Sequence, residues 1–273
     1  MTALRTALET IGYEVMPFRG TREAVLEHVP RTIALTVTAS PQKGIAAGVD
    51  LAIRLAADGY TVAPHLSAKL ISGRAHLDEL LGRISGAGID RLFVIGGDGE
   101  PAGDYADALT LLHAIRDSGH TFTDVGVAGY PEGHTAIPDE SLLAALKAKA
   151  ALADHVTTQV CFDPATVSEW SRSVAAQGVG IPVQVGVPGA VARQKLLRIS
   201  ASIGVGDSAR FLRKQSALLR RFFTPGGFDP TRLVRGFRAD LAEGVNPIAG
   251  FHVFTFNDVA GTERWRRRML ERS

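Results

Sequence analysis

Three polar side chains interrupt apolar segments of the chain and are the first candidates for chemistry. Glu14 lies inside YEVMP, Asp98 follows two glycines in LFVIGGDGEPAG (92–103), and Gln159 lies inside TTQVCF. A carboxyl or amide group in an apolar segment costs free energy unless it is paired or used, so we expect Gln159 to be a buried, hydrogen-bonded amide. The alternatives are an outward-facing surface position for Glu14 and a turn or helix N-cap role for Asp98.

The glycine-rich stretch around Asp98 has two interpretations, a phosphate-binding loop and the mouth of a barrel. A Rossmann fingerprint needs G-x-G-x-x-G between the first strand and the first helix, and a Walker loop needs Gly-Lys-Ser/Thr. The stretch instead follows the fourth predicted strand, contains Pro101 and lacks the lysine. The spacing therefore favours the barrel mouth, where two glycines let the backbone approach a flat ligand closely.

The elements that must position these residues alternate between short apolar runs and amphipathic stretches. Strands are predicted at 13–17, 32–39, 61–66, 91–96, 124–130, 155–162, 182–188 and 251–256, and helices at 44–59, 76–88, 105–119 and 139–153 among others. The strands are almost continuously apolar, as expected for parallel strands that are covered on both faces. Eight strand–helix units in this length predict an α/β protein with a (β/α)8 TIM barrel fold.

A single domain over residues 1–273 is predicted, because no linker or low-complexity tract divides the chain. Residues 204–244 are longer than one crossover and predict two extra helices, broken at 225–227. The basic end of the chain, RWRRRMLERS, predicts a last helix over 261–273. Its arginines favour a solvated face over a contact with an anionic ligand or a partner.

Composition excludes several classes of protein. Net charge is +2, and the lysines and arginines are mostly dispersed, so no nucleic-acid partner is expected. The single cysteine, Cys161, excludes an intramolecular disulfide framework and a cysteine-rich zinc site. No signal peptide and no membrane span are predicted, and the expected location is the cytoplasm.

The active site of such a barrel lies at the carboxyl ends of its strands, which adds further candidates. They are Thr36, Pro64, His65, the segment from Tyr130 to His134, Thr158, Thr255 and Asn257. His65 and His134 are imidazoles that could bind a metal, but no third ligand follows at a zinc-like spacing. Each is equally explained as a hydrogen-bonded structural histidine, so no metal site is predicted.

Six of these segments, in this order, resemble the methylenetetrahydrofolate reductase family of the bacterial single-domain type. YEVMP resembles the family's E-F-x-P-P, APHLS its A-P-H-L-T, IGGDGEP its L-R-G-D-x-P, VAGYPEGH its A-Y-P-E-x-H, TTQVCFD its I-T-Q-x-x-F-D, and FHVFTFN its F-H-F-Y-T-L-N. The resemblance implies a barrel enzyme that interconverts 5,10-methylenetetrahydrofolate and 5-methyltetrahydrofolate. NAD(P)H supplies the hydride in this family, usually through FAD.

The resemblance also implies roles for individual residues. Glu14 matches the general acid that opens the imidazolidine ring, Asp98 the acid that contacts pterin and flavin, and Gln159 the amide that contacts pterin and nicotinamide. Asn257 falls on a predicted substrate contact. Flavin- or nicotinamide-contacting positions are Thr36, Ala39, His65, Gly97, Asp98, Ala128, Tyr130, His134 and Lys149.

Some positions depart from the family pattern. By comparison with the family pattern, Gly96 replaces an arginine suited to a flavin phosphate, Ala145 and Ala148 replace polar contacts, Val37 replaces an aromatic residue, and Asp258 replaces an arginine suited to folate. Three hypotheses stay open: reduction with FAD, direct hydride transfer from NAD(P)H, and a diverged enzyme acting on another one-carbon carrier. A lyase or methyltransferase using Glu14 and Asp98, and a non-catalytic pterin-binding partner, are the alternatives outside this chemistry. A homo-oligomer is compatible with each.

Overall fold

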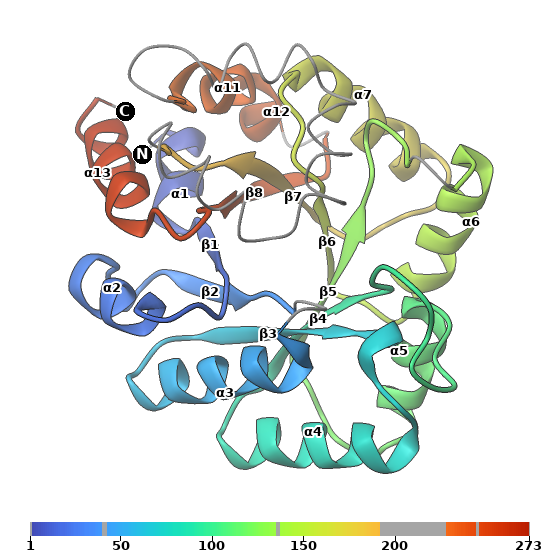
Figure 1. The fold of residues 1–273 in the computed structure, drawn as a ribbon. Helices are drawn as coiled ribbons and strands as arrows, with labels where there is room; N and C mark the ends of the chain where they lie inside the picture. Colours follow the sequence, from blue (N-terminus) through green and yellow to red (C-terminus); the bar gives the residue numbers. More distant parts are fainter. Residues whose placement is uncertain (1, 40–42, 135–136, 192–227, 244–245, 273) are drawn as a thin grey trace.

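The strands of the chain close into one parallel barrel. The computed structural model describes residues 2–39, 43–134, 137–191, 228–243 and 246–272. The strands are β1 (Gly12–Val15), β2 (Ala34–Val37), β3 (Val62–Ser67), β4 (Arg91–Ile95), β5 (Asp124–Gly129), β6 (His155–Thr158), β7 (Val183–Pro188) and β8 (Ile248–Phe254). Each pairs in parallel with the next, and β8 pairs with β1 (Figure 1). The (β/α)8 prediction is confirmed.

The helices lie outside this barrel (Figure 1). They are α1 (Ala3–Glu9), α2 (Thr21–His28), α3 (Gly44–Ala57), a 3-10 turn η1 (Ala68–Leu70), α4 (Arg74–Gly86), α5 (Ala108–Arg116), α6 (Asp139–Ala150), α7 (Pro164–Ala176), α11 (Thr231–Gly236), α12 (Arg238–Glu243) and α13 (Val259–Glu271). Among the described residues, no helix has the length and apolar character that crossing a bilayer requires.

The alternation along β1 shows how the sequence selects an inner and an outer face. Tyr13 and Val15 are buried, whereas Gly12 and Glu14 are partly exposed. Tyr13 and Val15 face the helices, where burial of apolar surface stabilises the fold. Glu14 pairs in register with Thr36 on one side and Phe254 on the other, so these three side chains share the inner face.

A buried ionic cluster joins β1 to the last helix. The hydroxyl of Tyr13 donates to Glu263 at 2.9 Å, and the Arg266 guanidinium donates to both oxygens of the same carboxylate at 2.8 and 3.0 Å. Arg266 also donates to the carbonyl of Leu8, a buried residue of α1. The guanidinium of Arg266 lowers the pKa of Glu263 against the opposing effect of burial. Each charge in the cluster therefore has a partner, as buried charges require.

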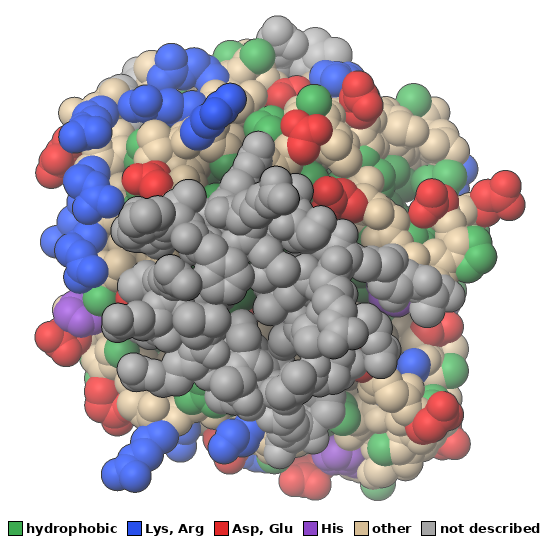
Figure 2. Space-filling model, turned by 45° about the horizontal axis from the view of Figure 1, so that its top comes forward, with side chains coloured by type: hydrophobic (Ala, Val, Ile, Leu, Met, Phe, Trp, Pro, Cys, Tyr) green, Lys and Arg blue, Asp and Glu red, His purple; other side chains and the backbone are tan. Residues whose placement is uncertain are grey.

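The C-terminal part of the chain carries the basic surface that the sequence indicated. The helix predicted at 261–273 is α13, which begins at Val259 and has exposed arginines at 264, 267 and 268. Figure 2 shows lysine and arginine side chains gathered on the side of the molecule where Figure 1 places α13. Of the extra helices predicted within 204–244, α11 and α12 are described, whereas the predicted break at 225–227 lies outside the described residues.

Candidate active site

The carboxyl group of Glu14 lies inside the barrel beside two imidazoles. Its Oε2 is 3.4 Å from Nε2 of His252 and 3.7 Å from Nε2 of His65. The Glu14 side chain is 14% exposed, and those of His65 and His252 are 6% and 8% exposed. Glu14 is therefore an inward-facing carboxyl with two imidazole neighbours, and the outward-facing alternative is wrong.

Several buried polar atoms in the barrel interior have no hydrogen-bond partner in the described part of the protein. Within the described part of the chain, Thr36 Oγ1, Thr157 Oγ1 and His65 Nε2 are buried without a hydrogen bond. Thr36 pairs in register with Glu14, and Thr157 lies on the inner face of β6. Buried polar atoms without hydrogen-bond partners are rare in proteins. The presence of three such atoms inside this barrel therefore indicates a place for a polar ligand or water.

Burial controls the protonation of His65. It lowers the pKa of the imidazole to about 4, against the attraction of Glu14, which acts in the opposite direction. The ring of His65 lies 4.6 Å from the ring of Phe93, measured between centroids. At neutral pH this imidazole is therefore uncharged, which makes it a dipolar neighbour of Glu14.

The glycines before Asp98 fit tightly against the end of β3. Gly97 has φ of +84°, and a Cβ there would lie 2.0 Å from Oγ of Ser67, so a larger residue would clash. The amide of Lys69 donates to the carbonyl of Gly96 at 3.0 Å. Position 97 therefore requires glycine because of Ser67 at the end of β3, as well as because of any ligand. Asp98 itself is exposed at the mouth of the barrel.

Gln159 is exposed, and the expectation of a buried amide there is wrong. The strand β6 ends at Thr158, one residue earlier than this side chain. The Oε1 atom of Gln159 accepts from the backbone amide of Val160 at 2.9 Å, and the backbone amide of Gln159 donates to the carbonyl of Gly129 at 2.8 Å. The apolar run continues past the strand because Val160 and Cys161 are buried in the loop that follows. Burial raises the pKa of the Cys161 thiol to about 12.

Asn257 joins the ends of β8 and β1. Its amide exchanges two hydrogen bonds with the backbone of Met16 and donates a third to Oγ1 of Thr21. Phe256 and Asn257 both have positive φ, 47° and 54°, which is strained for a phenylalanine. Phe256 packs against Val191 together with Phe162 and Phe228.

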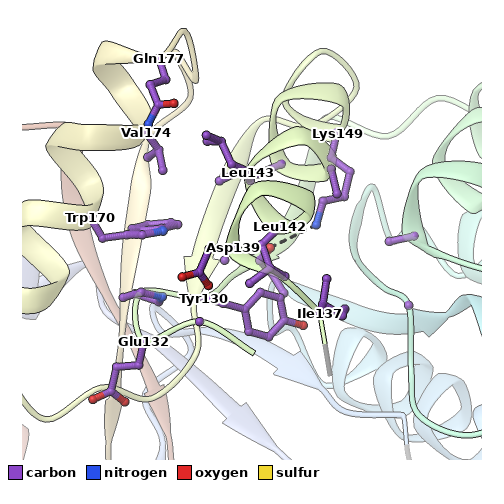
Figure 3. A pocket seen from close by; sticks show the side chains of 18 of the residues that line it. Tyr130, Glu132, Ile137, Asp139, Leu142, Leu143, Lys149, Trp170, Val174 and Gln177 are labelled. Carbon is purple, nitrogen blue, oxygen red and sulfur yellow. Dashed lines mark hydrogen bonds between the residues drawn. The ribbon is translucent and has the colours of Figure 1, made fainter. Parts of the chain in front are cut away.

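A pocket of about 620 Å³ lies beside the mouth, between α6 and α7 (Figure 3). Trp170 and Val174 of α7 form one wall, and Leu142 and Leu143 of α6 lie opposite (Figure 3). Ala128, Tyr130 and Lys149, which the resemblance assigns to the cofactor, also line it.

The polar groups of this pocket are mainly acidic. Asp107, Glu132 and Asp139 line it, and Lys149 is the one cationic side chain among its described lining residues. The Lys149 ammonium donates to the carbonyl of Ala128 at 3.3 Å, and burial lowers its pKa (Figure 3). The pocket therefore combines apolar walls with negative charge.

The structure brings the predicted residues together in two groups. Glu14, Thr36 and His65 meet inside the barrel, and Ala128, Tyr130 and Lys149 meet at the pocket. Tyr130 lines the pocket and lies close enough to Asp98, at the mouth, to feel its charge. Burial and this negative charge both raise the pKa of the Tyr130 hydroxyl. His134 lies against Tyr130, with ring centroids 5.4 Å apart. Ala39 follows the carboxyl end of β2, and Asn257 follows the carboxyl end of β8.

His252 is a member of the inner group that the sequence did not single out. It lies in FHVFTFN, and its signal was a histidine in an otherwise apolar strand. Among the described residues, no group of three or more histidine, cysteine, aspartate or glutamate side chains has the geometry to hold a metal ion.

Solved structures share the barrel architecture at low sequence identity. A GH18 chitinase from Pseudoalteromonas aurantia matches over 96% of this chain and 99% of its own, with a TM-score of 0.56 and 11% identity. An oxaloacetate acetylhydrolase matches over 99% of this chain and 84% of its own, with a TM-score of 0.53 and 12% identity. At such identities the likeness shows the fold alone.

Similarity in sequence is more informative. A probable methylenetetrahydrofolate reductase (NADPH) of Caenorhabditis elegans is 29% identical over 120 residues, which cover 41% of this chain and 18% of that protein. The model of the methylenetetrahydrofolate reductase family matches residues 26–205, while Glu14 and His252 lie outside the matched segment. The match covers more than half of the 273 residues. The chain belongs to the methylenetetrahydrofolate reductase family.

Proposed function

We propose that the protein reduces 5,10-methylenetetrahydrofolate to 5-methyltetrahydrofolate, with NAD(P)H as the hydride donor. The observation that carries this proposal is the Glu14 carboxyl, held inside the barrel beside two imidazoles and in register with Thr36, whose hydroxyl has no hydrogen-bond partner. A carboxyl in such a place suits the proton donor that opening of the imidazolidine ring requires. Membership of the family supports folate as the substrate.

Each candidate residue has a chemical task in this reaction. Glu14 donates a proton to N10 of the folate as the bond between N10 and the methylene carbon breaks. Asp98, exposed at the mouth, provides negative charge that stabilises the iminium cation formed by ring opening. Gln159 offers its amide to the pterin or the nicotinamide. The nicotinamide, when bound, supplies the hydride that reduces the iminium carbon.

The described residues do not fit the diphosphate of FAD in the pocket where the resemblance places the flavin. Lys149 is its one cation and already donates to a backbone carbonyl, while three carboxylates line the same space. The first turn of α6 carries Asp139 and Glu140, which occupy the helix end that would otherwise favour a phosphate. These features argue against FAD in this pocket and apply equally to the diphosphate of NAD(P)H, so in the proposed direct reaction the dinucleotide phosphates would lie outside this pocket.

The remaining positions implied by the resemblance are candidates for contacts with the nicotinamide or the pterin. They are Thr36, Ala39, His65, Gly97, Ala128, Tyr130, His134 and Asn257. Asn257 has the weakest case, because its amide already makes three hydrogen bonds to Met16 and Thr21.

An absorption spectrum of the purified protein and an assay of folate-dependent NAD(P)H oxidation test the proposal together. We expect a colourless protein that retains no flavin after FAD is added and the excess removed, yet oxidises NAD(P)H only when 5,10-methylenetetrahydrofolate is present. A yellow protein would instead support the flavin-dependent form of the reaction. A colourless protein without folate-dependent oxidation would refute the proposed activity and favour a diverged enzyme.

A further inference from the structure

Both imidazoles beside Glu14 approach the same carboxyl oxygen, Oε2. His252 comes from β8, the strand that pairs with β1, and His65 comes from β3. The two distances are 3.4 and 3.7 Å, so His252 is the nearer of the two. Thr36, in register with Glu14 on the inner face, is a further polar neighbour and has no ionisable group.

The two imidazoles differ in what they can do at neutral pH. His65 is uncharged there because burial lowers its pKa to about 4. It therefore has no acidic proton that it could give to Glu14. His252 is the remaining imidazole on this oxygen, and imidazole is the side chain best suited to gain and lose a proton near neutrality. Its ring packs edge to face against Phe254, with the ring centroids 5.2 Å apart.

A second charged group in the described part of the barrel is paired within itself and separated from Glu14. Asp124 accepts from Arg91 at 2.9 Å and lies 2.8 Å from Nδ1 of His155, at the amino ends of β4, β5 and β6. Phe93 lies between this group and the inner imidazoles, with ring centroids 6.4 Å from His155 and 6.3 Å from His252. Among the described residues, the ionisable side chains that directly face Glu14 are therefore the two histidines.

We propose that His252 positions the carboxyl of Glu14 and returns a proton to it after each turnover. This inference rests on the proposed reductase activity. When Glu14 has given its proton to N10, the carboxylate remains on Oε2. The protonated Nε2 of His252 then transfers its proton to Oε2, and the imidazole regains one from solvent. One proton from solvent and one hydride from NAD(P)H are thus consumed for each methyl group formed, which balances the reduction.

Kinetics of the first and later turnovers test the transfer. In His252→Gln we expect the first turnover, which uses the proton already on Glu14, to keep its wild-type rate in stopped-flow measurements. Later turnovers should slow by roughly tenfold or more, and free imidazole in the buffer should restore part of the rate. His65→Gln is the matched control, and imidazole should not accelerate it. Equal slowing of all turnovers without rescue, or no slowing at all, would overturn the proposal.

A second measurement needs no activity. Isotope-edited infrared spectra, with Glu14→Gln as the blank, report the pH at which the Glu14 carboxyl takes up its proton. We expect His252→Gln to shift this midpoint by a measurable amount from its wild-type position, and an unshifted midpoint would refute the coupling. If the wild type shows no folate-dependent NAD(P)H oxidation, the proposed function fails, whereas the infrared shift still decides whether His252 controls the protonation of Glu14.

Discussion

The side-chain amide of Asn257 pairs with the backbone of Met16 as a strand neighbour would. Its Oδ1 accepts from the Met16 amide at 2.8 Å, and its Nδ2 donates to the Met16 carbonyl at 3.0 Å. Met16 lies two residues after Glu14, and Oγ1 of Thr255 donates to the Glu14 carbonyl at 2.6 Å. The end of β8 therefore holds the backbone that carries the candidate proton donor.

Two substitutions of Asn257 separate the stabilisation from these hydrogen bonds from the free-energy cost of the positive φ. We expect Asn257→Ala to lower the free energy of unfolding by about 2 kcal/mol, because the Met16 groups lose their partners. Asn257→Gly loses the same bonds but tolerates the φ of 54°, so it should be more stable than the alanine variant by about 1 kcal/mol. Urea unfolding curves measure both values, and equal stabilities would show that the positive φ carries no strain.

Glu14→Gln should reduce kcat by roughly 10²- to 10⁴-fold, since an amide keeps the shape of the side chain but cannot donate an acidic proton. The KM for the folate should change much less. Glu23→Gln, at an exposed position in the first turn of α2, is the matched control and should keep wild-type activity. A Glu14→Gln enzyme with unchanged kcat would remove the acid role.

The depressed pKa of His65 makes stability depend on pH. In the unfolded chain this imidazole binds a proton below its ordinary pKa near 6.5, but in the folded protein only below about 4. Folding is therefore favoured by the neutral imidazole above pH ~6.5, and this contribution is lost as the pH falls towards about 4, to a maximum of about 3 kcal/mol.

His65→Gln should accordingly lose less stability than the wild type between pH 7.5 and 4.5 in urea unfolding. His113→Gln, at an exposed position on α5, should keep the wild-type pH dependence. If both variants follow the wild-type curve, the burial of the His65 imidazole has no energetic consequence in this range.

The acidic pocket should accept a dinucleotide when a cation is added to its wall. Ala145 and the adjacent Ala144 are both exposed on α6, but Ala145 lines the pocket and Ala144 lies outside it. We expect Ala145→Arg to bind FAD at least about tenfold more tightly than the wild type, as followed by quenching of flavin fluorescence, because a guanidinium pairs well with phosphate. Ala144→Arg is the control, and a similar gain there would indicate charge attraction without a specific contact.

The buried ionic cluster should be intolerant of single changes. Glu263→Gln leaves the Arg266 guanidinium buried without a counter-charge and should cost about 3 to 5 kcal/mol of stability. The double variant Glu263→Leu with Arg266→Met removes both charges and should be more stable than the single variant. A single variant that unfolds at the wild-type urea concentration would show that the cluster contributes little.

Sequence patterns predicted the barrel because each of the eight strands is a compact apolar run followed by an amphipathic helix or a turn. They predicted strand ends less well. The apolar run through Val160 and Cys161 extended the sixth predicted strand to residue 162, although β6 ends at Thr158. Those two residues are buried by packing in a loop, which apolar character alone cannot distinguish from a strand.

The site was partly predictable for a related reason. Glu14 was recognisable because a carboxyl in an apolar strand needs an explanation. The role of His252 depends on the register that pairs it with Gly12 across the closure of the barrel, a contact between the two ends of the chain. Similarly, the glycine at 97 is required by Ser67, which belongs to another strand. Such long-range relationships follow from tertiary packing, and local patterns do not contain them.

The burial of Cys161 makes the protein its own reporter of local opening. The chain has one cysteine, so a thiol-specific reagent can modify a single site. Burial and a pKa of about 12 keep that thiol unreactive while the loop after β6 is closed. The rate of labelling therefore reports how often this loop, which begins at Gln159, opens and exposes the thiol. A folate or nicotinamide that binds at the mouth would slow the labelling in proportion to its occupancy, without any introduced probe.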